Sequence, residues 1–241
     1  RQSFPDQEFV SQDDSMPAHD LQCPALSLPY ALGTTLETIP FPQGFLRADP
    51  HAVAAWADML RQDTPEAAVP PLRIGLVWAG APHPDVKVVA FADKRRSTDL
   101  ATFAPLAAAA PGAVFYSLQI GEKSVQARTP PPGMWLIDHT SLLGDFADTA
   151  ALVSTLDLVV AVDTSTAHVA AGLGKPVWLL SRYDQCWRWL SGRDDSPWYT
   201  SLRIYQQKAP FDWSAPMARM VADLGVFVQA HRRRAGGQQP R

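Results

Sequence analysis

From residue 72 onwards, short apolar runs alternate with segments of helical periodicity. Six runs are predicted to be strands, and the first, residues 72–80, is apolar over nearly its whole length, which is typical of a strand buried on both faces of a parallel sheet. They span residues 72–80, 113–121, 134–140, 156–164, 175–181 and 201–207. Helices are predicted at residues 99–110, 145–157, 165–174 and 216–231, the first of them capped by Ser97 or Thr98. The alternation predicts an α/β fold with a doubly wound, Rossmann-like parallel sheet.

The segment before this pattern has a different texture. Residues 1–20 are mostly polar and are predicted to be a disordered leader. Residues 21–71 are apolar but interrupted by Pro and Gly, which favours short elements, one helix over residues 51–61 and a linker. This stretch resembles the end of a domain whose beginning is missing. Residues 72–230 are predicted to form the main domain and residues 231–241 a flexible basic tail.

Composition disfavours several classes of function. The chain has 241 residues, 46% of them hydrophobic, and a formal net charge of −3, so it can bury a sizeable core and carries no basic field for nucleic acid. Its two cysteines, Cys23 and Cys186, form neither a disulfide framework nor a CxxC site. No apolar run approaches the length of a membrane-spanning helix. We therefore expect a cytoplasmic protein without a transmembrane segment.

The first candidate for chemistry is the junction between the fourth strand and its helix. There Asp163 ends the apolar run, Thr164 and Ser165 follow, and His168 lies one turn into the helix. The first N–H groups of a helix have no internal partner and carry partial positive charge, so they attract anions such as phosphate. The alternative is that Asp163 or Thr164 only caps the helix and that His168 is a satisfied interior histidine.

The second candidate is a basic cluster. Lys94, Arg95 and Arg96 are predicted to lie in the loop after the first strand, and such loops meet at the carboxyl edge of a parallel sheet. The cluster would then converge with Asp163 on a pyrophosphate site, whereas the alternative is a solvated surface run. The sequence contains neither GxGxxG nor GxxxxGK followed by Ser or Thr, which disfavours a nicotinamide enzyme or a P-loop ATPase.

Aromatic residues gather near the end of the main domain. Trp187, Trp189, Trp198 and Tyr199 could stack on a base or a sugar ring. Packing in the core or between domains is the preferred interpretation, because large rings dominate buried area. Cys186 has no neighbouring base in the sequence and is interpreted as an inert thiol.

Five segments in fixed order carry a family resemblance. They are GLVWAG, DKRRS, FYSLQIG, the stretch GDFADTAALVSTLDLVVAVDTSTAHVAAGLGKPVWLL, and WRWLSGRDDSPWYTSLRIYQQ. Together they resemble glycosyltransferase family 9, the heptosyltransferase-like family, and within it the branch fused to tetratricopeptide repeats. The resemblance runs from about residue 21 to about residue 224. It implies a GT-B fold, in which two Rossmann-like domains enclose the active site between them. This chain would be the carboxyl-terminal half of that fold, which binds the nucleotide-sugar donor.

The resemblance assigns the strand–helix junction to the donor. Asp163, Thr164 and Ser165 match the loop that surrounds the donor pyrophosphate, and His168 matches the histidine of the same helix start. Family members of known chemistry often have Gly where Ser165 stands. A free carboxylate does not suit a phosphate contact, so Asp163 is expected to accept from nearby N–H groups and shape the loop.

The resemblance also assigns residues outside that junction. Lys94 matches a basic residue that contacts donor phosphate, and Arg96 matches an arginine typical of the repeat-fused branch. The acidic residue that contacts the nucleotide ribose corresponds to Glu122, although Gln119 is an equally good match.

The implied reaction is inverting glycosyl transfer. An acceptor hydroxyl attacks the anomeric carbon of a nucleoside-diphosphate sugar, and Lys94 and the helix start stabilise the leaving diphosphate, so no metal or other cofactor is expected. The general base is expected in the amino-terminal domain, which leaves the catalytic residues unknown in this chain. The implied partners are the donor, a glycan, lipid-linked or protein acceptor, and upstream tetratricopeptide repeats. The alternative is a non-catalytic nucleotide-sugar or protein-interaction module that retains the fold.

Overall fold

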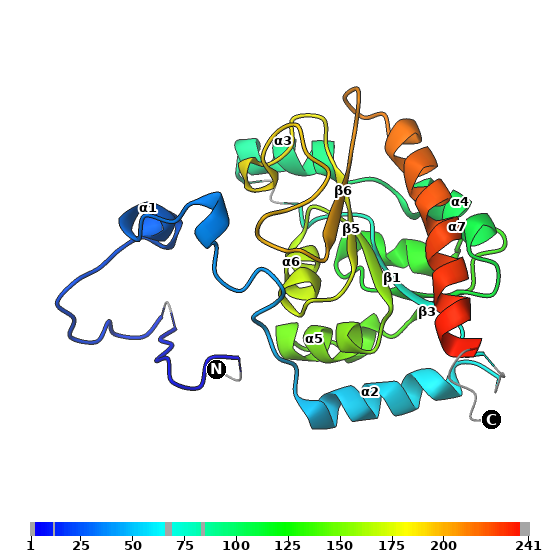
Figure 1. The fold of residues 1–241 in the computed structure, drawn as a ribbon, viewed down its shortest axis with the longest axis horizontal. Coiled ribbons are helices and arrows are strands. Elements are labelled where there is room, and N and C mark those ends of the chain that lie inside the picture. The colour runs from blue at the N-terminus through cyan, green and yellow to red at the C-terminus, as the bar shows by residue number, and fades with distance from the viewer. Residues whose placement is uncertain (1–2, 12, 66–68, 83–84, 237–241) are drawn as a thin grey trace.

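A single parallel sheet forms the centre of the molecule (Figure 1). The computed structural model describes residues 3–11, 13–65, 69–82 and 85–236. Six strands pair in the order β3-β2-β1-β4-β5-β6, and every pair is parallel. The strands are β1 (Arg73–Val77), β2 (Val114–Ser117), β3 (Leu136–Asp138), β4 (Leu158–Val162), β5 (Val177–Ser181) and β6 (Leu202–Gln206). The predicted α/β class with a doubly wound parallel sheet is confirmed.

Helices cover both faces of this sheet (Figure 1). One face is covered by α2 (Pro50–Gln62), α5 (Phe146–Ser154) and α6 (Ser165–Gly172), and the other by α4 (Ala104–Ala109) and α7 (Ser214–Gly236). The remaining helices are α1 (Leu28–Ala31), α3 (Lys87–Arg96) and the short 3-10 turns η1 (Ala25–Ser27), η2 (Leu36–Thr38), η3 (Leu100–Phe103), η4 (Glu122–Arg128), η5 (Thr140–Leu142) and η6 (Trp187–Trp189).

The side chains of β4 show why the strands read as continuous apolar runs. Leu158, Val160 and Val162 pack into the cluster beneath α4 and α7. Val159 and Ala161 point the opposite way, into the cluster beneath α2, α5 and α6. Successive side chains of a strand face opposite sides, so a strand covered on both faces needs an apolar residue at every position. Each buried Val or Leu contributes about 1.5–3 kcal/mol.

Two helix predictions need correction. Residues of the basic cluster were expected in a loop, but they form the last turn of α3. This helix has no apolar stripe to signal it, since Val88 and Phe91 are exposed and Asp93 is its buried residue. The helix predicted over residues 99–110 is divided into η3 and α4, and Ser97 does not cap it because its hydroxyl accepts from the N–H of Gly80 at 3.0 Å.

The chain also differs from the sequence prediction at both ends of the main domain. Helix α2 confirms the helix predicted over residues 51–61, with Asp49 accepting from the N–H of His51 at its start. Helix α7 continues past residue 231 to Gly236, so residues 231–236, expected in a flexible tail, lie in the helix; residues 237–241 fall outside the described part. No helix within the described residues has both the length and the apolarity to span a membrane.

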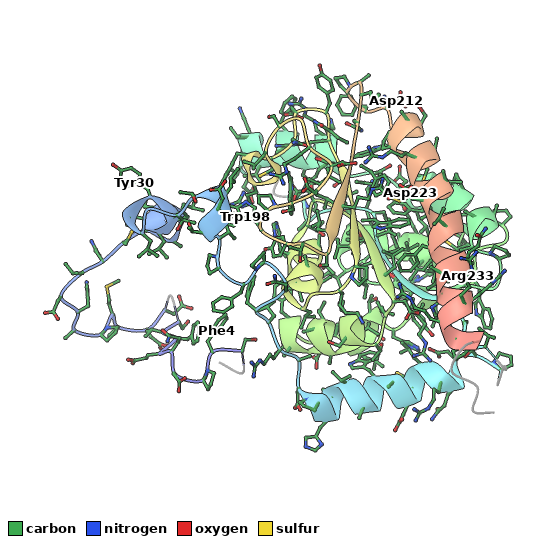
Figure 2. All side chains as sticks on the ribbon, in the orientation of Figure 1. Phe4, Tyr30, Trp198, Asp212, Asp223 and Arg233 are labelled. Carbon is green, nitrogen blue, oxygen red and sulfur yellow. The ribbon has the colours of Figure 1, made fainter. Side chains whose placement is uncertain are left out.

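An amino-terminal arm, formed by the described residues before α2, projects from the domain. It is attached around residues 42–46, where the carbonyl of Pro42 accepts from the N–H of Thr200 at 2.8 Å. Figure 2 shows Tyr30 on α1, well away from the sheet, and its side chain is 93% exposed. The attachment lies farther along, where the N–H groups of Phe45 and Leu46 both donate to the carbonyl of Gly172, at 2.7 and 2.8 Å. Gly174 has a φ of +73°, and a Cβ there would lie 2.6 Å from the carbonyl oxygen of Gln43. A side chain at position 174 would therefore push the arm away.

Candidate functional site

The candidate site lies at the switch point of the sheet, where β1 and β4 are neighbours although their connections leave in opposite directions. Ligands of doubly wound sheets bind outside the carboxyl ends of strands at such a point. Arg96, at the end of α3 after β1, donates through Nη1 to the carbonyl of Asp163 after β4, at 3.0 Å. Its Nε also donates to Asp93 Oδ1 at 3.0 Å. The predicted convergence of the basic cluster with the Asp163 loop is confirmed for Arg96.

Close packing around Arg96 explains the glycine that follows β1. A Cβ on Gly80 would lie 2.3 Å from Arg96 Nη2 and 2.5 Å from Asp93 Oδ1. The Arg96 side chain can cross the end of the strand because position 80 has no side chain. The final glycine of the GLVWAG segment therefore makes room for the cation.

The other two cations of the cluster take different directions. Positions 94 and 96 lie about 200° apart around a helix, because each residue advances about 100°. Lys94 is exposed, and no hydrogen bond or ion pair joins it to the described residues around Asp163. Arg95 forms an ion pair with Asp184 at 2.8 Å. Of the three cations, Arg96 is the one that contacts the loop after β4.

The start of α6 presents unpaired donors. Thr164 is its N-cap residue, and its Oγ1 is buried without a hydrogen-bond partner among the described residues. The first intrahelical bonds are those of the Ala167 and His168 N–H groups to the carbonyl of Thr164, at 3.1 and 3.4 Å. Ser165 is exposed, and the N–H groups of residues 165 and 166 precede those bonds. The helix start can therefore donate to an anion through backbone and hydroxyl groups.

The carboxylate of Asp163 has a different neighbour from the one predicted. It was expected to accept from N–H groups of the loop, but among the described residues no such bond forms, and its Oδ1 lies 3.9 Å from His168 Nε2. His168 lies in the first turn of α6, which begins two residues after Asp163. The carboxylate of Asp163 therefore faces the imidazole of His168 rather than the unpaired N–H groups at the start of α6.

His168 connects this helix start with a group of aromatic rings. Its Nδ1 forms a hydrogen bond with the Tyr199 hydroxyl at 3.1 Å, and its ring stacks on Trp189 with centroids 5.0 Å apart. Burial lowers the pKa of His168, Arg188 lowers it further, and Asp163 opposes them. The imidazole is therefore neutral at pH 7, and with 32% of its side chain exposed it is not a fully enclosed core residue.

The two candidates for a ribose contact have different surroundings. Gln119 is 3% exposed, and its Oε1 accepts from the N–H groups of Trp78 and Ala79, at 3.0 and 2.8 Å. Its Nε2 donates to the carbonyls of Ala79 and Ile120. Glu122 is exposed at the start of η4. The amide of Gln119 is thus fully occupied in joining the ends of β1 and β2, and Glu122 is the candidate free to contact a ligand.

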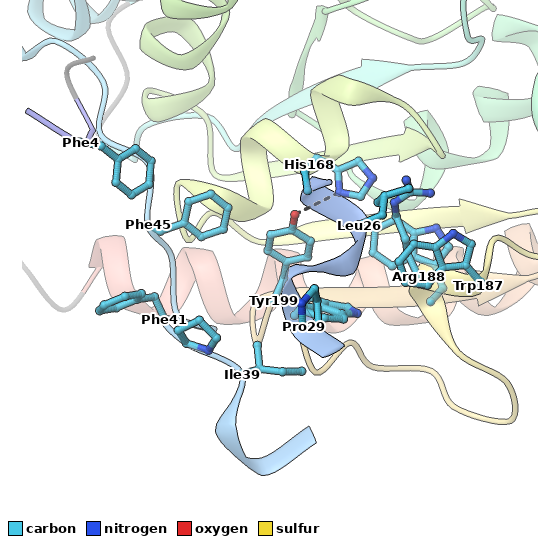
Figure 3. Close-up of a pocket in the computed structure, with 14 residues that line it drawn as sticks. Phe4, Leu26, Pro29, Ile39, Phe41, Phe45, His168, Trp187, Arg188 and Tyr199 are labelled. Atoms are coloured by element: carbon cyan, nitrogen blue, oxygen red, sulfur yellow. Dashed lines mark hydrogen bonds between the residues drawn. The ribbon is translucent and has the colours of Figure 1, made fainter. Parts of the chain in front are cut away.

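A pocket of about 480 Å³ lies beside His168, between the loop after β5 and the amino-terminal arm (Figure 3). The sequence analysis did not predict this cavity. The one feature that could have indicated it was the cluster of aromatic residues at 187–199, which was interpreted as packing. The structure divides that cluster, because Trp189 is fully buried whereas Trp187 is 58% exposed. Arg188 donates to the sulfur of Cys186 at 3.2 Å.

Within the described residues, no three His, Cys, Asp or Glu side chains gather in a way that could hold a metal ion.

Known proteins share this architecture. No protein-family model matches the sequence. The chain is similar to the structure of the Escherichia coli ADP-heptose LPS heptosyltransferase II, with a TM-score of 0.53 and 13% identity over 82% of this chain and 57% of that one. The chain has a GT-B-like glycosyltransferase fold. A glycosyltransferase family 9 structure from Veillonella parvula aligns less well, with a TM-score of 0.47 and 11% identity over 68% of this chain and 43% of that one.

The GT-B-like chain also has a curated relative. It is 29% identical over 202 residues to Protein FlbA of Caulobacter vibrioides, an alignment that covers 82% of this chain. The aligned part spans 32% of FlbA, so the chain corresponds to about a third of that protein. The fold predicted from the heptosyltransferase-like resemblance is confirmed at the level of architecture.

Proposed function

We propose that this chain is the donor-binding portion of a glycosyltransferase of the family 9 type, which transfers a sugar from a nucleoside-diphosphate sugar to an acceptor hydroxyl. The observation that carries the proposal is the meeting of Arg96 with the loop before α6, at the switch point of a GT-B-like sheet. A guanidinium and an unpaired helix start, placed side by side, form a site for a pyrophosphate.

The chemistry follows from charge. When the acceptor oxygen attacks the anomeric carbon with inversion, the bond from that carbon to the diphosphate oxygen breaks and negative charge develops on the diphosphate. Arg96 and the N–H groups of residues 165 and 166 would stabilise that charge, and the Thr164 hydroxyl can donate as well. The acceptor proton passes to a general base that we assign to the amino-terminal domain. With these donors present, the proposal needs no metal.

The remaining parts of the proposal rest on the sequence resemblance. They are a contact of Glu122 with the donor ribose, a supporting charge from Lys94 and tetratricopeptide repeats in the full-length protein. A cytoplasmic location is proposed separately, from the two isolated cysteines. The acceptor is a glycan, a lipid-linked group or a protein.

Calorimetric titration with ADP, UDP and GDP tests the proposal. One nucleotide should bind saturably, and Thr164→Val, which keeps the shape of the side chain but removes its oxygen, should weaken that nucleotide about tenfold. Arg96→Ala removes a charged donor and should weaken it about 10-fold to 100-fold. Arg95→Ala is the matched control, because it removes the same charge from the same helix end but not from the Asp163 loop.

The outcome that contradicts the proposal is equally clear. If the folded chain, verified by circular dichroism, binds none of these nucleotides, the site is not a donor site. The chain would then be a non-catalytic module that retains the fold. Equal losses in Arg95→Ala and Arg96→Ala would indicate general electrostatic attraction rather than a built site.

A further inference from the structure

The pocket beside His168 is lined mainly by apolar side chains. Apart from His168, Arg188 and Tyr199, every side chain in its lining is aliphatic, aromatic or a proline ring. Its volume of about 480 Å³ lies within the range of about 300–1,000 Å³ that is usual for ligand pockets. Leu26 and Phe41, both in the lining, are each 70% exposed. Large apolar side chains that are exposed within a cavity indicate a ligand or partner with an apolar surface.

The arm and the domain each form one wall of this pocket. Figure 3 shows Phe41 of the arm and Trp187 of the loop after β5 on opposite sides of it. The arm is held beside the domain by the bond from the N–H of Thr200 to the carbonyl of Pro42 and by its bonds to the carbonyl of Gly172. Both walls are therefore in place without a ligand, so a ligand would enter a cavity that is already formed.

Most polar groups of the lining are not available to a ligand. The hydroxyl of Tyr199 and Nδ1 of His168 are bonded to each other at 3.1 Å. The indole Nε1 atoms of Trp189 and Trp198 are buried and do not reach the cavity. A nucleobase or a sugar carries polar atoms around its ring, and burying them here without partners would cost affinity. The body of the ligand is therefore expected to be apolar.

Arg188 is the exception in this lining. Its guanidinium carbon lies 4.8 Å from the centroid of the Trp187 ring, and its Nη1 donates to the sulfur of Cys186 at 3.2 Å. No carboxylate among the described residues forms an ion pair with it. A partly buried cation without a counter-ion attracts an anion, and a guanidinium suits a phosphate or a carboxylate. The pocket thus offers one unpaired positive charge at the end of an apolar cavity.

From this arrangement we propose that the pocket binds a single molecule of an anionic amphiphile, with its alkyl or acyl chain against the apolar lining and its phosphate or carboxylate head on Arg188. The site goes beyond the proposed function, because it is built from the arm and the loop after β5 and its ligand contains no nucleotide. Different residues contact the head and the chain, so the two contacts can be tested separately.

Calorimetric titration with hexyl, octyl and decyl phosphate, each below its micelle-forming concentration, tests the site. A buried methylene raises affinity about threefold to fourfold, so two added carbons should raise it about tenfold until the chain fills the pocket. Octyl phosphate and octanoate should both bind tighter than 1-octanol, which has the chain but no charge. Inorganic phosphate, which has the charge but no chain, should not displace octyl phosphate.

Two variants with matched controls separate the head from the chain. Arg188→Gln should weaken octyl phosphate about tenfold and leave 1-octanol unchanged. Arg193→Gln is its control, because Arg193 follows on the same loop but pairs with Asp195 and does not line the pocket. Leu26→Ser should weaken both ligands about 3-fold to 10-fold. Leu32→Ser is its control, because Leu32 is also exposed on the arm but lies outside the lining.

Several results would overturn the proposal. Affinity that is independent of chain length, or equal losses in Leu26→Ser and Leu32→Ser, would show that the chain does not enter the pocket. Displacement by inorganic phosphate, or a loss in Arg96→Ala as large as that in Arg188→Gln, would place the head at the start of α6 instead. If the folded chain binds no alkyl phosphate, the apolar lining is a contact surface for another polypeptide. None of these results bears on the donor site, which the nucleotide titrations test alone.

Discussion

Truncation of Gln119 should destabilise the domain, because its amide holds the ends of β1 and β2 together. Gln119→Ala removes two hydrogen bonds accepted from the N–H groups of Trp78 and Ala79 and two donated to the carbonyls of Ala79 and Ile120. Each backbone group left unpaired in the interior costs about 1–3 kcal/mol, and water entering the space recovers part of this. We expect the free energy of unfolding to fall by about 3–5 kcal/mol, from a total that is typically about 5–15 kcal/mol.

Urea unfolding followed by circular dichroism measures this change. With a slope of about 2–3 kcal/mol per molar urea, the midpoint should fall by about 1–2 M. Glu122→Ala is the control, because Glu122 is exposed three residues farther along and should leave the midpoint unchanged. A loss below about 1 kcal/mol in Gln119→Ala would refute the reasoning, since it would mean that the backbone groups find other partners.

A conservative variant tests the acceptor role of Gln119 Oε1 separately from the donor role of Nε2. Gln119→Glu keeps an acceptor for the N–H groups of Trp78 and Ala79 but turns a second oxygen toward two carbonyls. Protonation of the new carboxyl restores one donor, so this variant should regain stability relative to wild type as the pH falls from 7.5 to 5. A constant difference across that pH range would contradict the assigned donor role of Nε2.

Two further predictions concern the arm and the histidine. Gly174→Ala should lower the midpoint of urea unfolding more than Gly133→Ala. Both glycines have φ above +70°, but only a Cβ at position 174 would meet a backbone atom, Gln43 O at 2.6 Å. Equal losses in the two variants would show that the arm moves away from the new Cβ without cost. Burial lowers the pKa of His168, so the stability that this residue contributes is fully present above its ordinary pKa of about 6.5 and is lost as the pH falls below it. Wild-type stability should therefore decline more steeply between pH 7.5 and 5.5 than the stability of His168→Gln. The difference is at most about tenfold in the folding constant per pH unit, because a single group titrates. Equal declines in wild type and variant would contradict this prediction.

The local pattern was sufficient to predict the sheet. Runs such as residues 156–164 contain apolar residues at consecutive positions, which is typical of a strand covered on both faces. The helix predicted over residues 145–157 forms as α5, and Asp145 caps it through bonds to the N–H groups of Ala147 and Asp148. By contrast, α3 was missed because it buries almost no apolar surface and so leaves no periodic signal.

The candidate site was only partly accessible from the sequence. In a doubly wound sheet with the order β3-β2-β1-β4-β5-β6, the loops after β1 and β4 meet at the switch point, so the basic cluster and Asp163 could be expected to converge. Which of the adjacent cations faces Asp163 depends on the rotation of α3, and whether Gln119 binds a ligand or the backbone depends on where its amide comes to lie.

The sequence by itself thus determined the class of fold, the order of the strands along the chain, and the edge of the sheet at which the candidate residues lie. These depend on periodicity and on the handedness of crossovers, which are properties of short segments. Only the tertiary structure decided that Arg96 rather than Lys94 contacts the loop, that Gln119 is a structural clamp, and that Trp187 and His168 line one pocket. These features arise from contacts between residues far apart in sequence, whose geometry is set when the layers pack together.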